Sequence, residues 1–210
     1  MLEGSRLAEI VEACRHHKIW LVSDEIYHGL TYGLPEETAL ARTSGAIVVN
    51  SFSKYFSMTG WRVGWLVVPQ ELVRPVERLA QNLYISPPTV AQVAAIGAFD
   101  GLDELEANKR VYAENRELLL HELPKAGLGR IVPADGAFYL YLNISDFGGD
   151  SVAFTRAMLA EIGVAATPGV DFDAARGGHY VRLCYAGSTA AMAEAARRLR
   201  GWQRLTASKR

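Results

Sequence analysis

A lysine stands among hydroxyl groups and a guanidinium in the segment from Asn50 to Trp65, which reads NSFSKYFSMTGWRVGW. Two hydroxyls, those of Ser51 and Ser53, come directly before Lys54, and Arg62 follows eight residues later between two glycines. Hydroxyl donors and a forked guanidinium are groups that bind phosphate well. The spacing therefore predicts a phosphate site next to an amine, on a turn that follows an apolar run.

A lysine amine beside a phosphate site meets two needs of pyridoxal 5'-phosphate. The amine forms a Schiff base with the cofactor aldehyde, and the surrounding donors hold the phosphate. A second segment, LVSDEIY, ends an apolar stretch with Asp24, and Tyr27 follows three residues later. A carboxylate beside the pyridine nitrogen keeps that nitrogen protonated, because a nearby negative charge favours the cationic form. Asp24 is therefore the candidate partner of the ring nitrogen.

Both segments resemble the cofactor motifs of the class I/II aminotransferases, which are fold-type I pyridoxal-phosphate enzymes. The resemblance implies that Lys54 and Asp24 are catalytic. It also implies which side chains bind the cofactor: Lys54, Asp24 on the ring nitrogen, Tyr27 on the ring phenolate oxygen, and Ser51, Ser53 and Arg62 around the phosphate.

A third segment, YVRLCYAGS, resembles a late strand of the same family, whose arginine binds the substrate carboxylate. The resemblance therefore assigns Arg182 to substrate binding. It further implies amino-group transfer between an amino acid and a 2-oxo acid, in which the Lys54 amine moves the proton of the substrate α-carbon. Fold-type I lysines also serve lyases, decarboxylases and synthases, but the MTGWR sequence after the lysine favours an aminotransferase.

Each of these residues also has an ordinary structural interpretation when it is taken alone. Lys54 would be a solvated surface residue, Asp24 a turn cap, and Arg62 one half of a surface ion pair. Arg182 would form a buried salt bridge, and the two serines would be turn formers. We favour the cofactor site because the residues occur together, in the order and with the local spacings of the family.

Two alternatives from other functional classes remain open. The first is a non-catalytic truncated remnant, or an interaction partner of a full-length aminotransferase, because the sequence contains only the later half of the family pattern and no NPxG stretch. The second is a regulator with an aminotransferase-like sensor domain, although no DNA-binding module is recognisable. The missing half implies weak cofactor binding, an exposed sheet edge, and association as a homodimer or with a homologous chain.

Composition is consistent with a cytoplasmic enzyme that acts on small molecules. Half of the 210 residues are apolar and the net charge is −1, so nothing indicates a nucleic-acid or membrane partner. No secretory signal is recognisable in the first residues, which lead into a helical pattern. Cys14 and Cys184 lie far apart without metal-binding spacing, and we expect them to be reduced, partly buried thiols. No metal site is expected.

The pattern of apolar residues predicts an α/β fold whose strands are covered on both faces. Strands are expected at 19–23, 47–51, 63–68, 137–143 and 180–185, and helices at 5–17, 71–82, 89–99, 104–123, 152–162 and 189–204. By the resemblance, residues 1–110 form a partial fold-type I large domain that binds pyridoxal phosphate. This domain contains a three-stranded sheet with helices. Residues 111–210 form a small α+β C-terminal domain. The stretch from Pro168 to Phe172 fits a family loop at the cleft entrance and a plain Pro-Gly turn equally well.

Overall fold

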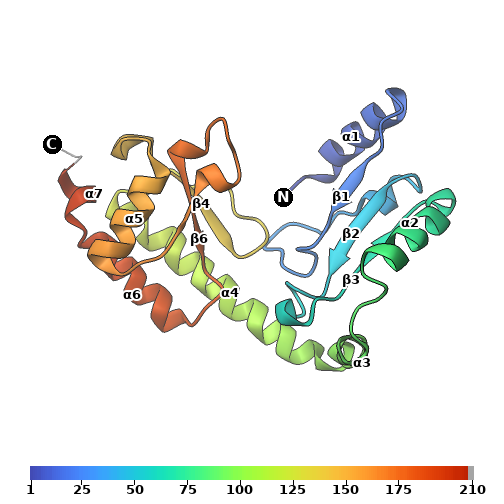
Figure 1. Ribbon diagram of the computed structural model, residues 1–210. Coiled ribbons are helices and arrows are strands. Elements are labelled where there is room, and N and C mark those ends of the chain that lie inside the picture. Colours follow the sequence, from blue (N-terminus) through green and yellow to red (C-terminus); the bar gives the residue numbers. More distant parts are fainter. Residues whose placement is uncertain (208–210) are drawn as a thin grey trace. The chain divides into compact units, whose positions relative to one another are not determined.

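The computed structural model describes residues 1–207 and divides into two compact units. The first unit is Met1–Ala107, and the second begins at Asn108. The division falls inside the long helix α4, Leu102–Glu122 (Figure 1). In the described part of the chain no helix combines the length and the apolar character needed to cross a membrane.

The first unit contains a three-stranded sheet with the order β1-β2-β3. Strands β1 (Val22–Asp24) and β2 (Ile47–Ser51) are parallel, and β3 (Gly64–Val67) runs antiparallel to β2. The strand expected at 19–23 begins later, because Lys18 adopts a left-handed conformation and the amide of Ile19 bonds back to the Cys14 carbonyl. These residues finish the preceding helix and are not available to the sheet.

Three further helices belong to the first unit: α1 (Gly4–His16), α2 (Gln70–Leu83) and α3 (Thr89–Gly97). The helix expected at 89–99 ends at Gly97 and continues as a 3-10 turn over Ala98–Gly101. Small clusters of buried residues lie within the unit. One contains Ala39, Ala46 and Val48, and another contains Phe52, Met58 and Ala95.

An uncovered apolar surface runs over β3 and the helices α2 and α3. All four residues of β3 are exposed, and α2 buries none of its residues although its sequence is strongly amphipathic. The expectation of a sheet covered on both faces is therefore wrong for β3 within residues 1–207, since side chains of β3 on both faces are exposed there. The exposed side chains of this surface are Trp65, Leu66, Val67, Leu79, Leu83, Val90, Val93 and Ile96.

The second unit contains an antiparallel sheet with the order β4-β6-β5. Its strands are β4 (Tyr139–Asn143), β5 (Thr167–Pro168) and β6 (Tyr180–Cys184), and its helices are α5 (Ser151–Ile162), α6 (Thr189–Arg200) and α7 (Gln203–Ala207). Side chains alternate between the two faces of a strand. One face is buried and apolar, with Leu140, Leu142, Val181 and Leu183, and the other carries Tyr139, Tyr141, Tyr180 and Arg182.

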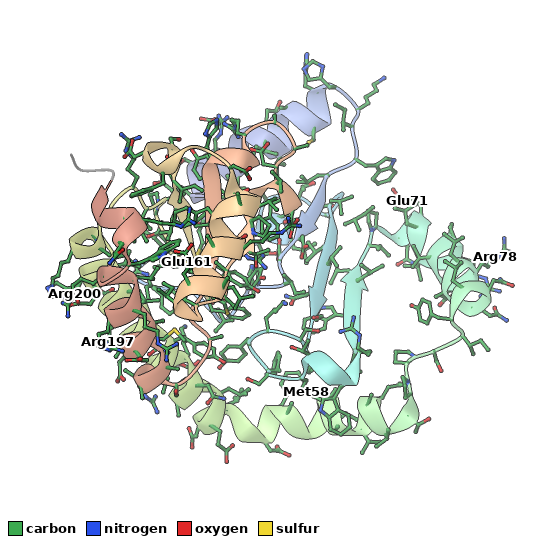
Figure 2. All side chains as sticks on the ribbon, turned by 60° about the vertical axis from the view of Figure 1, so that its left-hand side comes forward. Met58, Glu71, Arg78, Glu161, Arg197 and Arg200 are labelled. Carbon is green, nitrogen blue, oxygen red and sulfur yellow. The ribbon has the colours of Figure 1, made fainter. Side chains whose placement is uncertain are left out.

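Three expectations for the second unit need correction. The helix expected at 189–204 breaks after Arg200, because buried Trp202 turns inward and its indole nitrogen donates to Glu161 of α5 at 2.8 Å. Glu161, Arg197 and Arg200 are labelled in Figure 2. The strand expected at 137–143 begins at Tyr139, since Ala137 has a positive φ of 62°. Cys184, the last residue of β6, is exposed and not partly buried.

Candidate active site

Two candidate residues lie at the ends of neighbouring strands. Asp24 is the last residue of β1 and Ser51 the last of β2. Because β1 and β2 are parallel, both strand ends lie at the same edge of the sheet. The side chain of Asp24 is exposed, and its Oδ1 accepts a hydrogen bond from the Ile26 amide at 3.2 Å. Asp24 therefore does shape a turn, and the second carboxylate oxygen still gives it further acceptor capacity.

Lys54 lies on a tight turn that is fixed by a buried residue on each side. The amide of Ser57 bonds to the Lys54 carbonyl at 3.0 Å, and the amide of Met58 bonds to the Phe52 carbonyl at 3.0 Å. Phe52 and Met58 are both buried in the same cluster. The half-buried Lys54 extends its Nζ to 5.7 Å from the centroid of the Tyr27 ring. The turn after β1 and the turn after β2 thus bring an amine and a phenol together.

A chain of hydrogen bonds connects the predicted phosphate residues. The Ser53 amide donates to Ser51 Oγ at 3.0 Å, and the Ser53 carbonyl accepts from Thr59 Oγ1 at 2.6 Å. Arg62 has a left-handed backbone, with φ 56°, and its Nη1 donates to the Thr59 carbonyl at 2.8 Å. Gly64 permits a close approach, since a Cβ there would lie 2.7 Å from the Asn50 carbonyl oxygen. The structure thus connects Ser51, Ser53 and Arg62 through Thr59, with Arg62 exposed to solvent.

A buried carboxylate that the sequence interpretation missed supports the Asp24 turn. Glu25 is only 8% exposed, and its Oε1 accepts from Ser23 Oγ at 2.9 Å and from the Ala39 amide at 2.8 Å. Its Oε2 lies 3.5 Å from His28 Nε2. Residues that follow each other in extended chain point to opposite sides, so Asp24 faces outward where Glu25 faces inward. The adjacent acidic residues Asp24 and Glu25 could therefore have indicated, from the sequence, that one carboxylate of the pair is buried.

Tyr55 secures the other side of the lysine turn. Its hydroxyl donates to Glu106 Oε1 at 2.6 Å, and its ring lies against Gly29, whose φ is +89° and which has no room for a side chain. Burial, and next the hydrogen bond to Glu106, raise the pKa of Tyr55 to about 12. The phenol therefore stays neutral and remains a hydrogen-bond donor throughout the physiological range. Sequence reasoning passed over this residue.

Arg182 lies against two aromatic rings on the polar face of the second sheet. It lies opposite Tyr141 on β4 and opposite Thr167 on β5. Its Cζ is 4.0 Å from the ring centroid of Tyr139 and 4.0 Å from that of Phe172. The Arg182 Nε is buried without a hydrogen-bond partner among the described residues. The buried salt bridge considered from the sequence is thus not formed within residues 1–207.

The loop from Pro168 to Phe172 is a 3-10 turn over Gly169–Asp171, and it places Phe172 against Arg182. A Cβ on Gly169 would lie 2.6 Å from the Tyr180 carbonyl oxygen and even closer to the carbonyl oxygen of Gly177. Glycine is therefore required by the packing of two backbones. Whether this loop borders a substrate cleft stays a prediction.

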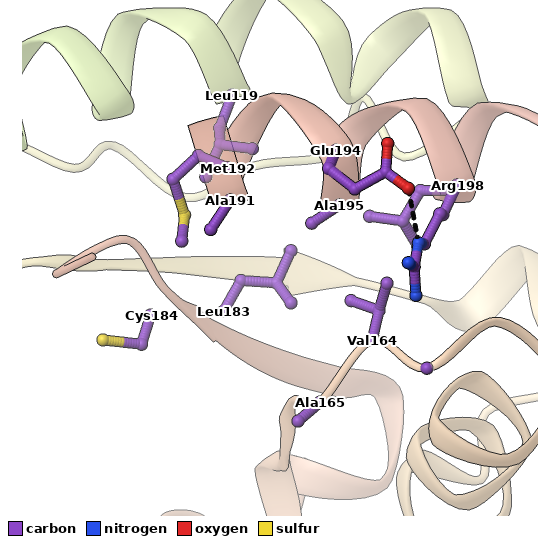
Figure 3. A pocket seen from close by; sticks show the side chains of 12 residues that line it. Leu119, Val164, Ala165, Leu183, Cys184, Ala191, Met192, Glu194, Ala195 and Arg198 are labelled. Carbon is purple, nitrogen blue, oxygen red and sulfur yellow. Dashed lines mark hydrogen bonds and ion pairs between the residues drawn. The ribbon is translucent and has the colours of Figure 1, made fainter. Parts of the chain in front are cut away.

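A cavity of about 280 Å³ lies under α6 in the second unit (Figure 3). It is lined by Leu183 and Cys184 of β6 together with residues of α6, and Arg182 is not among its lining residues. The pair formed by Glu194 and Arg198 stands at its margin, with Nε to Oε1 at 2.8 Å. The cavity is therefore separate from the predicted site residues.

Comparison with known proteins decides the family. The family model for aminotransferases of class I and II matches residues 2–199. This chain is a class I/II aminotransferase family member. Its fold is accordingly α/β and corresponds to part of the fold-type I architecture. Arg182 lies in the second unit and the other six candidate residues lie in the first, so the aminotransferase motifs are divided between the two units.

The relatives are about twice as long as this aminotransferase family chain. Valine--pyruvate aminotransferase of Mycobacterium tuberculosis is 49% identical over 206 residues, which are 96% of this chain and 53% of the relative. The (5-formylfuran-3-yl)methyl phosphate transaminase of Methanocaldococcus jannaschii is 36% identical over 188 residues, which are 86% of this chain and 49% of the relative.

Solved structures give the same result. An aminotransferase from Mycobacterium tuberculosis superposes with a TM-score of 0.93 at 47% identity, over 96% of this chain and 53% of that one. A putative aminotransferase from Silicibacter pomeroyi superposes with a TM-score of 0.94 at 50% identity, over 99% and 55% of the two chains. The chain therefore spans about half the length of the relatives it matches.

Proposed function

We propose that this chain carries the cofactor lysine and the substrate-carboxylate arginine of a pyridoxal-phosphate-dependent aminotransferase, which transfers an amino group between an amino acid and a 2-oxo acid. The observation that carries the proposal is the convergence of Lys54 with Tyr27, 5.7 Å from amine to ring centroid, beside the strand end that bears Asp24. Family membership and the names of the relatives support the same reaction.

The chemistry of these donors fits pyridoxal phosphate. Lys54 supplies an amine for covalent attachment, Asp24 a carboxylate for the ring nitrogen, and Tyr27 a phenol for the ring oxygen. Ser51, Ser53 and Arg62, connected through Thr59, supply hydroxyl and guanidinium donors for a phosphate group. When bound, the cofactor supplies an electron sink for the substrate α-carbon.

The residues of the chain have separate tasks in this reaction. The Lys54 amine holds the cofactor and then carries the proton of the substrate α-carbon, since an amine is a suitable general base once it is released. The Asp24 carboxylate keeps a cationic nitrogen charged. Glu25 fixes the turn that carries Asp24 and Tyr27, and Tyr55 fixes the turn that carries Lys54.

Arg182 is proposed to bind the α-carboxylate of the amino acid. A guanidinium forms two parallel hydrogen bonds with a planar carboxylate, and a lysine cannot reproduce that fork. Two features support the assignment: the buried Arg182 Nε without a partner among residues 1–207, and the aromatic rings that hold the group. Buried polar groups of this kind are normally satisfied by a partner.

We also propose that the first unit associates with further polypeptide, either a second copy or a homologous chain. Exposed apolar patches of this kind normally mark interaction surfaces, and an unpaired strand edge adds main-chain donors and acceptors. The exposed residues of β3, α2 and α3 are the supporting observation. The same surface favours the alternative function, in which the chain is an interaction partner of an aminotransferase and has no activity of its own.

The decisive test of function uses two proteins: the chain alone, and the chain fused behind the earlier half of the Mycobacterium tuberculosis relative. With pyridoxal phosphate and valine present, the fusion should form a 2-oxo acid, and the chain alone should form little or none. Lys54→Ala should abolish the reaction in the fusion, whereas Lys18→Ala, which changes an exposed lysine of the same unit, should not. A folded fusion whose activity does not require Lys54 would contradict the proposal.

A further inference from the structure

The guanidinium of Arg182 is approached by aromatic rings from two different elements. Tyr139 belongs to β4, on the strand next to Arg182, and Phe172 follows the 3-10 turn Gly169–Asp171. Both ring centroids lie 4.0 Å from Arg182 Cζ. At this distance a cation gains electrostatic attraction from each ring face, and the gain is larger where water is excluded. The buried Nε indicates that water is excluded on that side.

A guanidinium with rings against it offers hydrogen bonds only in its own plane, because all five of its N–H donors lie in that plane. A ligand that stacks on the cation must displace a ring, whereas a carboxylate that forms hydrogen bonds in the plane of the group need not. The enclosure also holds the group in one orientation before any ligand arrives, and such preorganisation strengthens binding by reducing the ordering cost. The two rings therefore select both the direction and the geometry of a ligand at Arg182.

The position of Phe172 is in turn fixed by the backbone. Gly169 and Gly177 pack so closely that neither has space for a Cβ. The Tyr141 hydroxyl lies beside Gly169, and burial raises the pKa of this phenol. The amides of Phe172 and Asp173 both bond to the Gly169 carbonyl, at 2.9 and 3.0 Å. Phe172 itself is half exposed, at 50%, so its ring is not needed to fill a core. An exposed phenylalanine held over a cation by a rigid turn is better explained by that cation than by stability.

We propose that Phe172, together with Tyr139, is a positioning residue that clamps the Arg182 guanidinium edge-on for a planar monocarboxylate. The inference rests on the proposed function of Arg182 and adds the residues that orient it. Phe172 acts through Arg182 and does not take part in the reaction itself.

The test follows the Nε–Hε signal of Arg182 by nuclear magnetic resonance in the full chain, with the signal identified by its loss in Arg182→Lys. Two quantities are measured: the exchange of Hε with water, and the affinity for propionate, with neutral propionamide as the control ligand. Phe172→Leu should speed the exchange and weaken propionate binding, each by about tenfold. Phe172→Tyr, which keeps a ring, should stay within about twofold of the wild type, and Val170→Ala on the same turn should change neither quantity.

The outcomes separate the two proposals. If Arg182→Lys weakens propionate binding but Phe172→Leu changes neither quantity, the clamp is overturned and the carboxylate role of Arg182 stands. If Phe172→Leu speeds exchange without weakening propionate, or Phe172→Tyr fails to rescue, the ring has only a packing role and the inference is overturned. If the wild type does not bind propionate, or Arg182→Lys binds it equally well, the carboxylate role fails and the clamp fails with it.

Discussion

Replacing Gly169 by alanine should loosen the second unit and release Phe172 from Arg182. The added Cβ would lie 2.6 Å from the Tyr180 carbonyl oxygen and 2.8 Å from the Tyr141 hydroxyl, and closer still to the Gly177 carbonyl. Real Cβ atoms essentially never approach within 3.0 Å, so two backbone segments must separate. Overpacking of this kind typically costs 1–3 kcal/mol, and because the obstacles are main-chain atoms we expect about 2–3 kcal/mol.

Amide hydrogen exchange measures this cost within one unit. A loss of about 2–3 kcal/mol accelerates exchange roughly 30- to 150-fold in peptides of β4 and β6, while peptides of β1 and β2 act as an internal reference. Gly129→Ala is the matched control, since its nearest atom would be 3.6 Å away. Acceleration below about threefold, or equal acceleration in Gly129→Ala, would refute the packing argument.

Three further predictions concern the ion and hydrogen-bond contacts of the two units. Because the pKa of Tyr55 is raised to about 12, the contribution of this phenol to stability is present below pH 10 and is lost as pH rises toward 12. Tyr55→Phe should remove this alkaline dependence of the unfolding free energy in urea titrations. Hydrogen bonds from Arg197 and Arg198 lower the pKa of Glu194 to about 2, so its contribution is present above about pH 4.5 and is lost as pH falls toward 2; Glu194→Gln should flatten stability over that window. Fully buried Asn115 donates to two backbone carbonyls at 3.0 and 2.8 Å, and Asn115→Leu should cost about 2–4 kcal/mol in the urea unfolding free energy, whereas a cost below about 1 kcal/mol would contradict its bridging role.

The residues that the sequence could identify are those whose role depends on local order along the chain. The serine-lysine turn and the carboxylate at the end of an apolar strand are contiguous patterns, and the structure places both at one edge of a parallel strand pair. The strand 47–51 was also predictable, because a short apolar run bounded by turn residues has few other interpretations. The assignments of cofactor and substrate roles remain predictions.

Features set by contacts between distant segments were not predictable. The break after α6 was hidden because Leu199, Trp202 and Leu205 continue an apolar spacing although the helix ends at Arg200. Strand β5 has two residues, too few to show alternation. The contact of Phe172 with Arg182 depends on a close approach of two glycine backbones, which no local pattern encodes.

The central claim, that Lys54 is the cofactor lysine, is tested most directly by trapping the attachment. The fused protein and the chain alone are incubated with pyridoxal phosphate, reduced with borohydride, digested and mapped by mass spectrometry. The claim requires the label on Lys54, with strong labelling in the fusion and weak labelling in the chain alone. Labelling that instead falls on Lys18, Lys109 or Lys125, or that persists unchanged in Lys54→Ala, would contradict the claim.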